Sequence, residues 1–166
     1  MKKSALLTLT LLLTCLVAQA QETTKKVSIY DPKANAGEDI KNAVAKAARE
    51  KKNVLLQIGG NWCVWCIRFH NLVNSDSTLK SISDANFVTV HVNYSPENKN
   101  EKVLAQLGYP QRFGFPVFVI LDEKGNRIHT QNSAYLEKDK GHDPKVVAEF
   151  LRQWSPAALD PKQYSK

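Results

Sequence analysis

The sequence centres on Val54-Leu55-Leu56-Gln57-Ile58-Gly59-Gly60-Asn61-Trp62-Cys63-Val64-Trp65-Cys66, in which a short apolar run stops at two glycines and leads into two cysteines. An apolar run of this length, bounded by polar residues and then by glycines, is typical of a strand that is buried on both faces. Periodicity alone leaves a buried helix open as the alternative. We expect a buried strand that delivers a pair of thiols.

The residues after Cys66 follow a helical pattern. Apolar side chains recur at spacings of three and four, at Ile67, Phe69, Leu72 and Val73. The cysteines should therefore lie in the first turn of a helix, where free backbone N–H groups and the positive end of the helix dipole favour an anion. That anion would be a thiolate at Cys63, the form of cysteine that attacks disulfides.

Residues 1–20 have the pattern of a secretory signal peptide. Met1-Lys2-Lys3 precedes an apolar stretch, and Ala18-Gln19-Ala20 predicts cleavage after Ala20. A retained anchor is less favoured, because the apolar stretch falls short of the roughly 20 residues that a membrane-spanning helix needs. A further alternative is lipidation at Cys15, since Leu12-Leu13-Thr14-Cys15 resembles a bacterial lipoprotein box, with a threonine where a small residue is expected.

Cleavage after Ala20 would leave Cys63 and Cys66 as the only cysteines of the mature chain. A bond between cysteines so close in sequence adds little stability, so we expect their role to be chemical. The remaining length fits one domain, residues 21–154, followed by a C-terminal tail, residues 155–166. The full chain carries a formal charge of +7, but its basic residues are scattered, which argues against a nucleic-acid partner.

Patterns elsewhere in the chain predict alternating helices and strands. Strands are predicted at 27–30, 87–93 and 117–121, the last paired with 127–130 in a hairpin. Helices are predicted at 36–50 after an Asn35 cap, from the cysteines to about Val73 with a further turn near Leu79, at 96–107 after Ser95-Pro96, and at 145–154. Residues from Ser155 onward are expected to be extended.

The motif Trp62-Cys63-x-x-Cys66 at a strand-to-helix junction, with Gly114-Phe115-Pro116 before a hairpin, resembles the thioredoxin superfamily over residues 36–154. The likeness extends to exported bacterial thioredoxin-like proteins and to the C-terminal domain of the membrane thiol-disulfide interchange protein. It implies an α/β fold, a thioredoxin-like three-layer sandwich with a central mixed sheet and helices on both faces. It also implies that Cys63 is the nucleophile, Cys66 the resolving thiol and Pro116 a cis-proline beside them.

The same resemblance implies a shallow substrate groove next to the thiols. It would be bordered by Trp62, Trp65, Phe115 and Pro116, with a client strand lying against the backbone before the proline. Trp62 and Phe115 fit the core of the protein equally well, because aromatic residues beside a strand end are commonly buried. Both interpretations of these two residues stay open at the level of sequence.

Departures from the family pattern concern proton transfer. Gln57 stands where thioredoxins bury an aspartate, and His91 stands where the neighbouring strand usually carries a lysine. Our hypothesis is that Gln57 and His91 form a pair that moderates proton transfer near the resolving thiol. The alternative is that His91 is an ordinary strand histidine with its hydrogen bonds satisfied.

The Cys-x-x-Cys spacing also occurs in zinc sites. The chain has no second such pair to complete a tetrahedral site. His70 falls on the same helix face as Cys63 and Cys66 and is a candidate third ligand. The favoured interpretation is a packed or solvated helix histidine and no metal, because closed structural sites use four ligands.

These observations predict a periplasmic thiol:disulfide oxidoreductase without a cofactor, which reduces or isomerises protein disulfides. Its partners would be protein thiols and disulfides and an upstream thiol electron donor, for example a membrane thiol relay. Secretion beyond the envelope, or a lipid anchor at Cys15, are the alternatives for its location. The alternative function is a binding or chaperone module on the same fold, which holds a client or a metal while its dithiol stays mostly idle.

Overall fold

The computed structural model describes residues 28–165. The predicted signal peptide at 1–20 and the lipidation alternative at Cys15 lie outside the described residues. None of the helices within 28–165 has the length and apolar character needed to cross a membrane.

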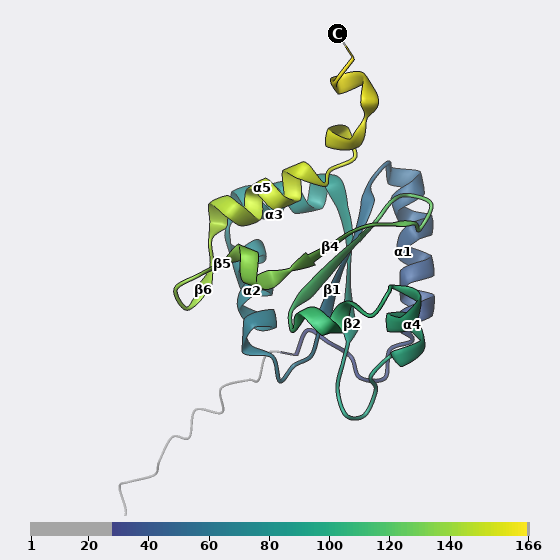
Figure 1. The fold of residues 1–166 in the computed structure, drawn as a ribbon, viewed down its shortest axis with the longest axis vertical. Helices are drawn as coiled ribbons and strands as arrows, with labels where there is room; N and C mark the ends of the chain where they lie inside the picture. The colour runs from purple at the N-terminus through teal and green to yellow at the C-terminus, as the bar shows by residue number, and fades with distance from the viewer. Residues whose placement is uncertain (1–27, 166) are drawn as a thin grey trace, which may run out of the picture.

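Five α-helices and a four-stranded sheet make up most of the described chain (Figure 1). The sheet strands are β1 (Asn53–Gly59), β2 (Phe87–Asn93), β3 (Val117–Leu121) and β4 (Arg127–Asn132). The helices are α1 (Ala36–Glu50), α2 (Val64–Ser75), α3 (Ser77–Asn86), α4 (Glu101–Gln106) and α5 (Pro144–Gln153). Strands β5 (Glu137–Lys138) and β6 (Gly141–His142) form a separate small hairpin before α5.

The strands lie in the order β2-β1-β3-β4, with β1 and β2 parallel and the other pairs antiparallel. The predicted central mixed sheet is therefore confirmed. Strand β1 is buried along its whole length, as its continuous apolar run predicts, because both of its faces are covered by helices.

Alternation along the strands sends side chains into two cores, one on each face of the sheet. Val54, Leu56 and Ile58 of β1 pack with buried residues of α1 and α4. Leu55 of β1 faces the other way and packs with Phe69 of α2 and buried residues of α3 and α5. This pattern gives the three layers that the resemblance implies, with α1 and α4 on one face and α2, α3 and α5 on the other (Figure 1).

Four local predictions are wrong. Residues 28–30 form no strand, because Asn61 rather than a neighbouring strand bonds the N–H groups of Ile29 and Tyr30, at 2.9 and 3.0 Å. The turn expected near Leu79 is the separate ten-residue helix α3, capped by Asp76. The tail from Ser155 is not extended but contains two 3-10 turns, at Ala157–Leu159 and Pro161–Gln163.

The fourth error is the helix predicted to start at Ser95-Pro96, since α4 begins only at Glu101. Ser95 instead forms a bridge with Asn98, and side-chain amides of the loop bond its backbone. Asn93 donates to the Asn98 carbonyl at 2.9 Å, and Asn100 donates to the Asn93 carbonyl at 2.7 Å. Asparagine side chains that satisfy backbone groups in this way compete with helix formation.

Candidate active site

The two cysteines lie at the start of α2, as predicted. Cys63 is the N-cap residue, and its sulfur accepts a hydrogen bond from the backbone N–H of Cys66 at 3.1 Å. The two sulfurs are joined in a disulfide. Cys63 retains a small exposed fraction, 5%, whereas Cys66 is fully buried. The helix N-terminus therefore directs an N–H group at the more accessible sulfur, an arrangement that stabilises a thiolate there.

Gly59, the last residue of β1, brings the sheet into close contact with the disulfide. A Cβ atom at this position would stand closer than 3.0 Å to the Cys66 sulfur and 3.0 Å from the hydroxyl oxygen of Tyr30. Only glycine leaves room for both groups. The glycine that ends the apolar run thus has a packing role at the site in addition to ending the strand.

Tyr30 is a residue of this site that the sequence reasoning missed. Its side chain is buried in a small cluster with Cys63 and Cys66, and burial raises the pKa of its hydroxyl. The side-chain amide of Gln57 donates to the Tyr30 hydroxyl oxygen at 2.9 Å and to the backbone carbonyl of Cys66 at 3.0 Å. Gln57 therefore links Tyr30 to the cysteine helix.

Asn61 holds the segment around Tyr30 against the cysteine loop. Its side-chain oxygen accepts the N–H groups of Ile29 and Tyr30, and its nitrogen donates to the Tyr30 carbonyl at 2.7 Å. These bonds resemble those of a neighbouring strand, although they come from a single side chain. In the sequence, the only indication of these contacts was a polar asparagine just before the Trp62-Cys63 pair.

Aromatic side chains border the accessible side of Cys63. Trp62 is 54% exposed, and its ring meets that of Phe115 edge to face, with centroids 5.4 Å apart. Its indole N–H donates to the Tyr94 carbonyl at 2.7 Å, and the Tyr94 ring stacks on Phe115. The Phe115–Pro116 peptide bond is cis, as the resemblance implies. A hollow of about 600 Å³ next to Trp62 is lined by Trp62, Tyr94, Ser95, Pro96 and Lys99.

Trp65 points to a different side of the cysteine helix from Trp62. Its ring meets the His142 ring of β6 edge to face at 5.6 Å, and the Arg68 guanidinium lies over it at 5.1 Å. Trp65 is half-buried and also packs against the Tyr30 and cysteine cluster. Its contacts belong to the α2 and β6 side of the molecule, whereas Trp62 and Phe115 form the aromatic border together.

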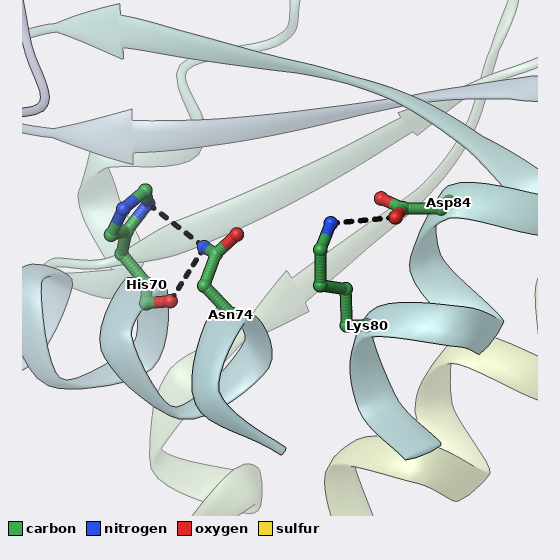
Figure 2. A network of polar contacts seen from close by, with 4 residues as sticks. All are labelled: His70, Asn74, Lys80 and Asp84. Carbon is green, nitrogen blue, oxygen red and sulfur yellow. Dashed lines mark hydrogen bonds and ion pairs between the residues drawn. The ribbon is translucent and has the colours of Figure 1, made fainter. Parts of the chain in front are cut away.

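His70 and His91 face each other across α2 and β2. His70 Nδ1 lies 3.3 Å from His91 Nε2, and Asn74 donates to the His70 carbonyl at 2.8 Å. A cavity of about 140 Å³ beside them is lined by these residues together with Gln57, Lys80 and Asp84. Figure 2 shows His70 and Asn74 on α2, and the ion pair of Lys80 with Asp84 on α3.

The histidine pair shows where His70, the candidate third metal ligand, lies. Among residues 28–165, no group of three His, Cys, Asp or Glu side chains is placed to hold a metal ion. Cys63 and Cys66 are bonded to each other and His70 turns toward His91, so a role of His70 as a third ligand beside the two cysteines stays a prediction.

The predicted pair of Gln57 and His91 forms only in part. The two residues are directly opposite in the parallel register of β1 and β2 and line the same cavity. However, the Gln57 amide bonds Tyr30 and Cys66, whereas His91 faces His70. Burial, with a smaller contribution from the nearby His70, lowers the pKa of His91 to about 4. Burial also lowers the pKa of His70.

Comparisons with known proteins found a matching family model and a relative in sequence. A family model described as thioredoxin-like matches residues 34–123. The chain is 25% identical over 147 residues to a protein of Chlamydia pneumoniae named disulfide bond reductase DsbH, with 80% of this chain and 89% of the relative covered.

Two solved structures share the fold. A disulphide isomerase from Xylella fastidiosa Temecula1 superimposes with a TM-score of 0.69 at 22% identity, covering 76% of this chain and 96% of the isomerase. A thioredoxin from Thermus thermophilus superimposes with a TM-score of 0.53 at 20% identity, covering 75% and 92% of the two chains. The match to the family model, the mixed sheet and the disulfide at the start of α2 together show that the chain belongs to the thioredoxin-like family.

Proposed function

We propose that this protein is a thiol:disulfide oxidoreductase that reduces or isomerises protein disulfides in the bacterial periplasm. The observation that carries the proposal is the Cys63–Cys66 disulfide at the start of α2, with Cys63 at the N-cap and the Cys66 N–H bonded to its sulfur. A dithiol in this position cycles between a reduced and an oxidised form and needs no cofactor.

The geometry supports different roles for the two sulfurs. In the reduced protein, the Cys63 thiolate would attack one sulfur of a client disulfide, form a mixed disulfide and release the other client sulfur as a thiolate. Cys66 would then lose its proton to water and attack Cys63, which releases the second client sulfur. The client disulfide gains two electrons, and the protein is left with the observed Cys63–Cys66 bond.

The surroundings of Cys63 suit a protein client rather than a small molecule. Trp62 and Val64, on either side of Cys63, each expose 54% of their surface. The half-buried Phe115 lies against Trp62, and the buried Pro116 follows it through a cis bond. We propose that a client segment lies in extended form along Trp62, Phe115 and Pro116, with Trp65 supporting the other side of α2. Its partners are protein thiols and disulfides, together with an upstream thiol donor that returns the dithiol to its reduced form.

A trapping experiment tests the reaction. In the Cys66→Ala variant, Cys63 can still attack a client, but no neighbouring thiol remains to resolve the mixed disulfide, so that complexes accumulate. The Cys63→Ala variant is the control, because its remaining sulfur is buried. Non-reducing electrophoresis of envelope fractions measures the complexes. If folded Cys66→Ala gives no more dithiothreitol-sensitive adducts than Cys63→Ala, the chain is better described as a binding module.

A second experiment tests the proposed location and the division into a signal peptide at 1–20, a domain at 21–154 and a tail at 155–166. Protein recovered from the periplasmic fraction should begin at Gln21 and carry no lipid, because Ala18-Gln19-Ala20 has the small residues that signal peptidase recognises. Mass spectrometry of the intact protein measures both properties. An acylated N-terminal Cys15 would show a lipid anchor instead, and an uncleaved Met1 would show a retained segment.

A further inference from the structure

We propose that the Tyr30 hydroxyl donates a hydrogen bond to the thiolate of Cys66 during resolution of the mixed disulfide. This inference rests on the proposed oxidoreductase function and adds a residue to it. It assigns to a tyrosine outside the Cys-x-x-Cys motif a role in the second step of the exchange.

The position of Tyr30 brings its hydroxyl next to the Cys66 sulfur. Both atoms lie close to Gly59. A Cβ atom built on Gly59 would lie 3.0 Å from the hydroxyl oxygen and closer still to the sulfur. Tyr30 is 2% exposed and Cys66 is 0% exposed, in one apolar cluster. Water therefore has little access to the side of Cys66 that faces Tyr30.

The hydrogen bond from Gln57 leaves the Tyr30 hydroxyl free to donate. The Gln57 amide N–H occupies the phenol oxygen as acceptor at 2.9 Å, so the hydroxyl hydrogen must point elsewhere. Within residues 28–165, the hydroxyl of Tyr30 accepts the bond from Gln57 and donates no hydrogen bond in the oxidised structure. A buried O–H group without an acceptor is costly, and the opening of the disulfide would supply one as the Cys66 thiolate.

The chemistry of the two groups suits a hydrogen bond rather than a proton transfer. Burial raises the pKa of Tyr30, so the phenol keeps its proton beside a thiolate, which is a much weaker base than a phenolate in this environment. The Gln57 N–H polarises the phenol and strengthens its donor character. Without a buried carboxylate at position 57, this donor pair offers another way to favour the charged form of Cys66 in an apolar site.

The reaction of the reduced protein with Ellman's reagent separates the two steps. Attack by Cys63 releases a first thionitrobenzoate, and attack by Cys66 on the resulting mixed disulfide releases a second. The rate of the second release, followed by stopped-flow absorbance across pH, reports the thiolate fraction of Cys66. In Tyr30→Phe, which keeps the ring and removes only the hydroxyl, this second phase should slow about tenfold at neutral pH, with its midpoint moved to higher pH.

The first phase should stay unchanged in Tyr30→Phe, because the Cys66 backbone N–H still bonds the Cys63 sulfur. Tyr135→Phe is the matched control, since Tyr135 is 77% exposed and should give the wild-type rates. A second phase with the wild-type pH dependence in Tyr30→Phe would overturn the inference. Equal slowing of both phases would overturn it too, because a structural defect would explain that result.

Gln57→Met provides a second variant should Tyr30→Phe fail to fold. It removes the amide that orients the phenol and should slow the second phase in the same direction, and an unchanged second phase there would equally contradict the inference. A different result would contradict the proposed oxidoreductase function. If the wild-type protein releases only one thionitrobenzoate per chain, Cys66 does not resolve mixed disulfides at all, whereas an effect missing only in the variants leaves the oxidoreductase role intact.

Discussion

Gly59 shows at the scale of one residue how closely the sheet and the dithiol are packed. It ends β1 and lies against both the Cys66 sulfur and the Tyr30 hydroxyl. Its backbone angles do not require glycine, because it is not among the residues with positive φ. The lack of a side chain, rather than backbone freedom, explains this glycine.

Gly59→Ala should lower the free energy of unfolding by about 1–3 kcal/mol, since an added methyl group in a packed site forces its neighbours to shift. Urea denaturation of the oxidised protein measures the change. Gly141→Ala is a matched control, because a Cβ there would meet no atom within 4 Å, and its unfolding free energy should change by less than about 0.5 kcal/mol. Equal stability of the two variants would contradict the packing role of Gly59.

At the scale of elements, Asp76 separates α2 from α3, a helix of which the sequence patterns predicted only one turn near Leu79. Its N–H bonds the Leu72 carbonyl at the end of α2, and its carboxylate accepts the N–H groups of Thr78 and Leu79 at 2.9 and 3.0 Å at the start of α3. The same residue therefore ends one helix and caps the next. Helix α3 brings Lys80 and Asp84 to the cavity that His70 and His91 also line. Figure 2 shows the Lys80–Asp84 ion pair together with His70 and Asn74.

Asp76→Ala should cost about 1 kcal/mol of stability, because two N–H groups at the start of α3 lose their side-chain acceptor. Asp76→Asn is the control that keeps an oxygen in place and should stay within a few tenths of a kcal/mol of the wild type, since asparagine and aspartate are comparable caps. Thermal unfolding of the three proteins measures the difference. An Asn variant as unstable as the Ala variant would show that charge, and not capping, explains the loss.

At the scale of the whole molecule, the buried histidines link stability to pH. The pKa of His91 falls from its ordinary value of 6.5 to about 4, chiefly because burial disfavours the imidazolium and secondly because His70 is close. Burial also lowers the pKa values of His70 and His142. Between pH 6.5 and about 4, the unfolded chain binds more protons at His91 than the folded protein does, so acid favours unfolding.

The contribution of His91 is thus fully present above pH 6.5 and is lost as the pH falls to about 4. The loss would reach at most about 3 kcal/mol, at 1.36 kcal/mol for each pKa unit. In His91→Gln the unfolding free energy should fall less steeply over this range, as measured by denaturant titrations at several pH values. The carboxylates titrate in both proteins, so their effect cancels in the difference. Parallel stability curves for the two proteins would show that His91 does not carry the acid sensitivity.

The hydrophobic pattern by itself determined the central strands, the dithiol helix and the place of the dithiol, whereas the three-layer arrangement was inferred from the family resemblance. The apolar run of β1, the alternation in β2 and the helical spacing after Cys66 each depend on neighbours in sequence, and each was confirmed. The cis bond before Pro116, inferred from the family resemblance, is also present. These features are accessible because strands and helices impose a repeat on the residues within them.

The tertiary structure alone decided the surroundings of the sulfurs. Tyr30 contacts Gln57, 27 positions away in sequence, and His70 contacts His91, 21 positions away. No local sequence pattern predicts either contact. The loop after β2 departed from its helical pattern for a similar reason, since an amide from Asn98 bonds the carbonyl of Pro32 far back in the chain. Side chains that satisfy one another between distant segments depend on how the layers are packed, and packing is a property of the whole fold rather than of any stretch within it.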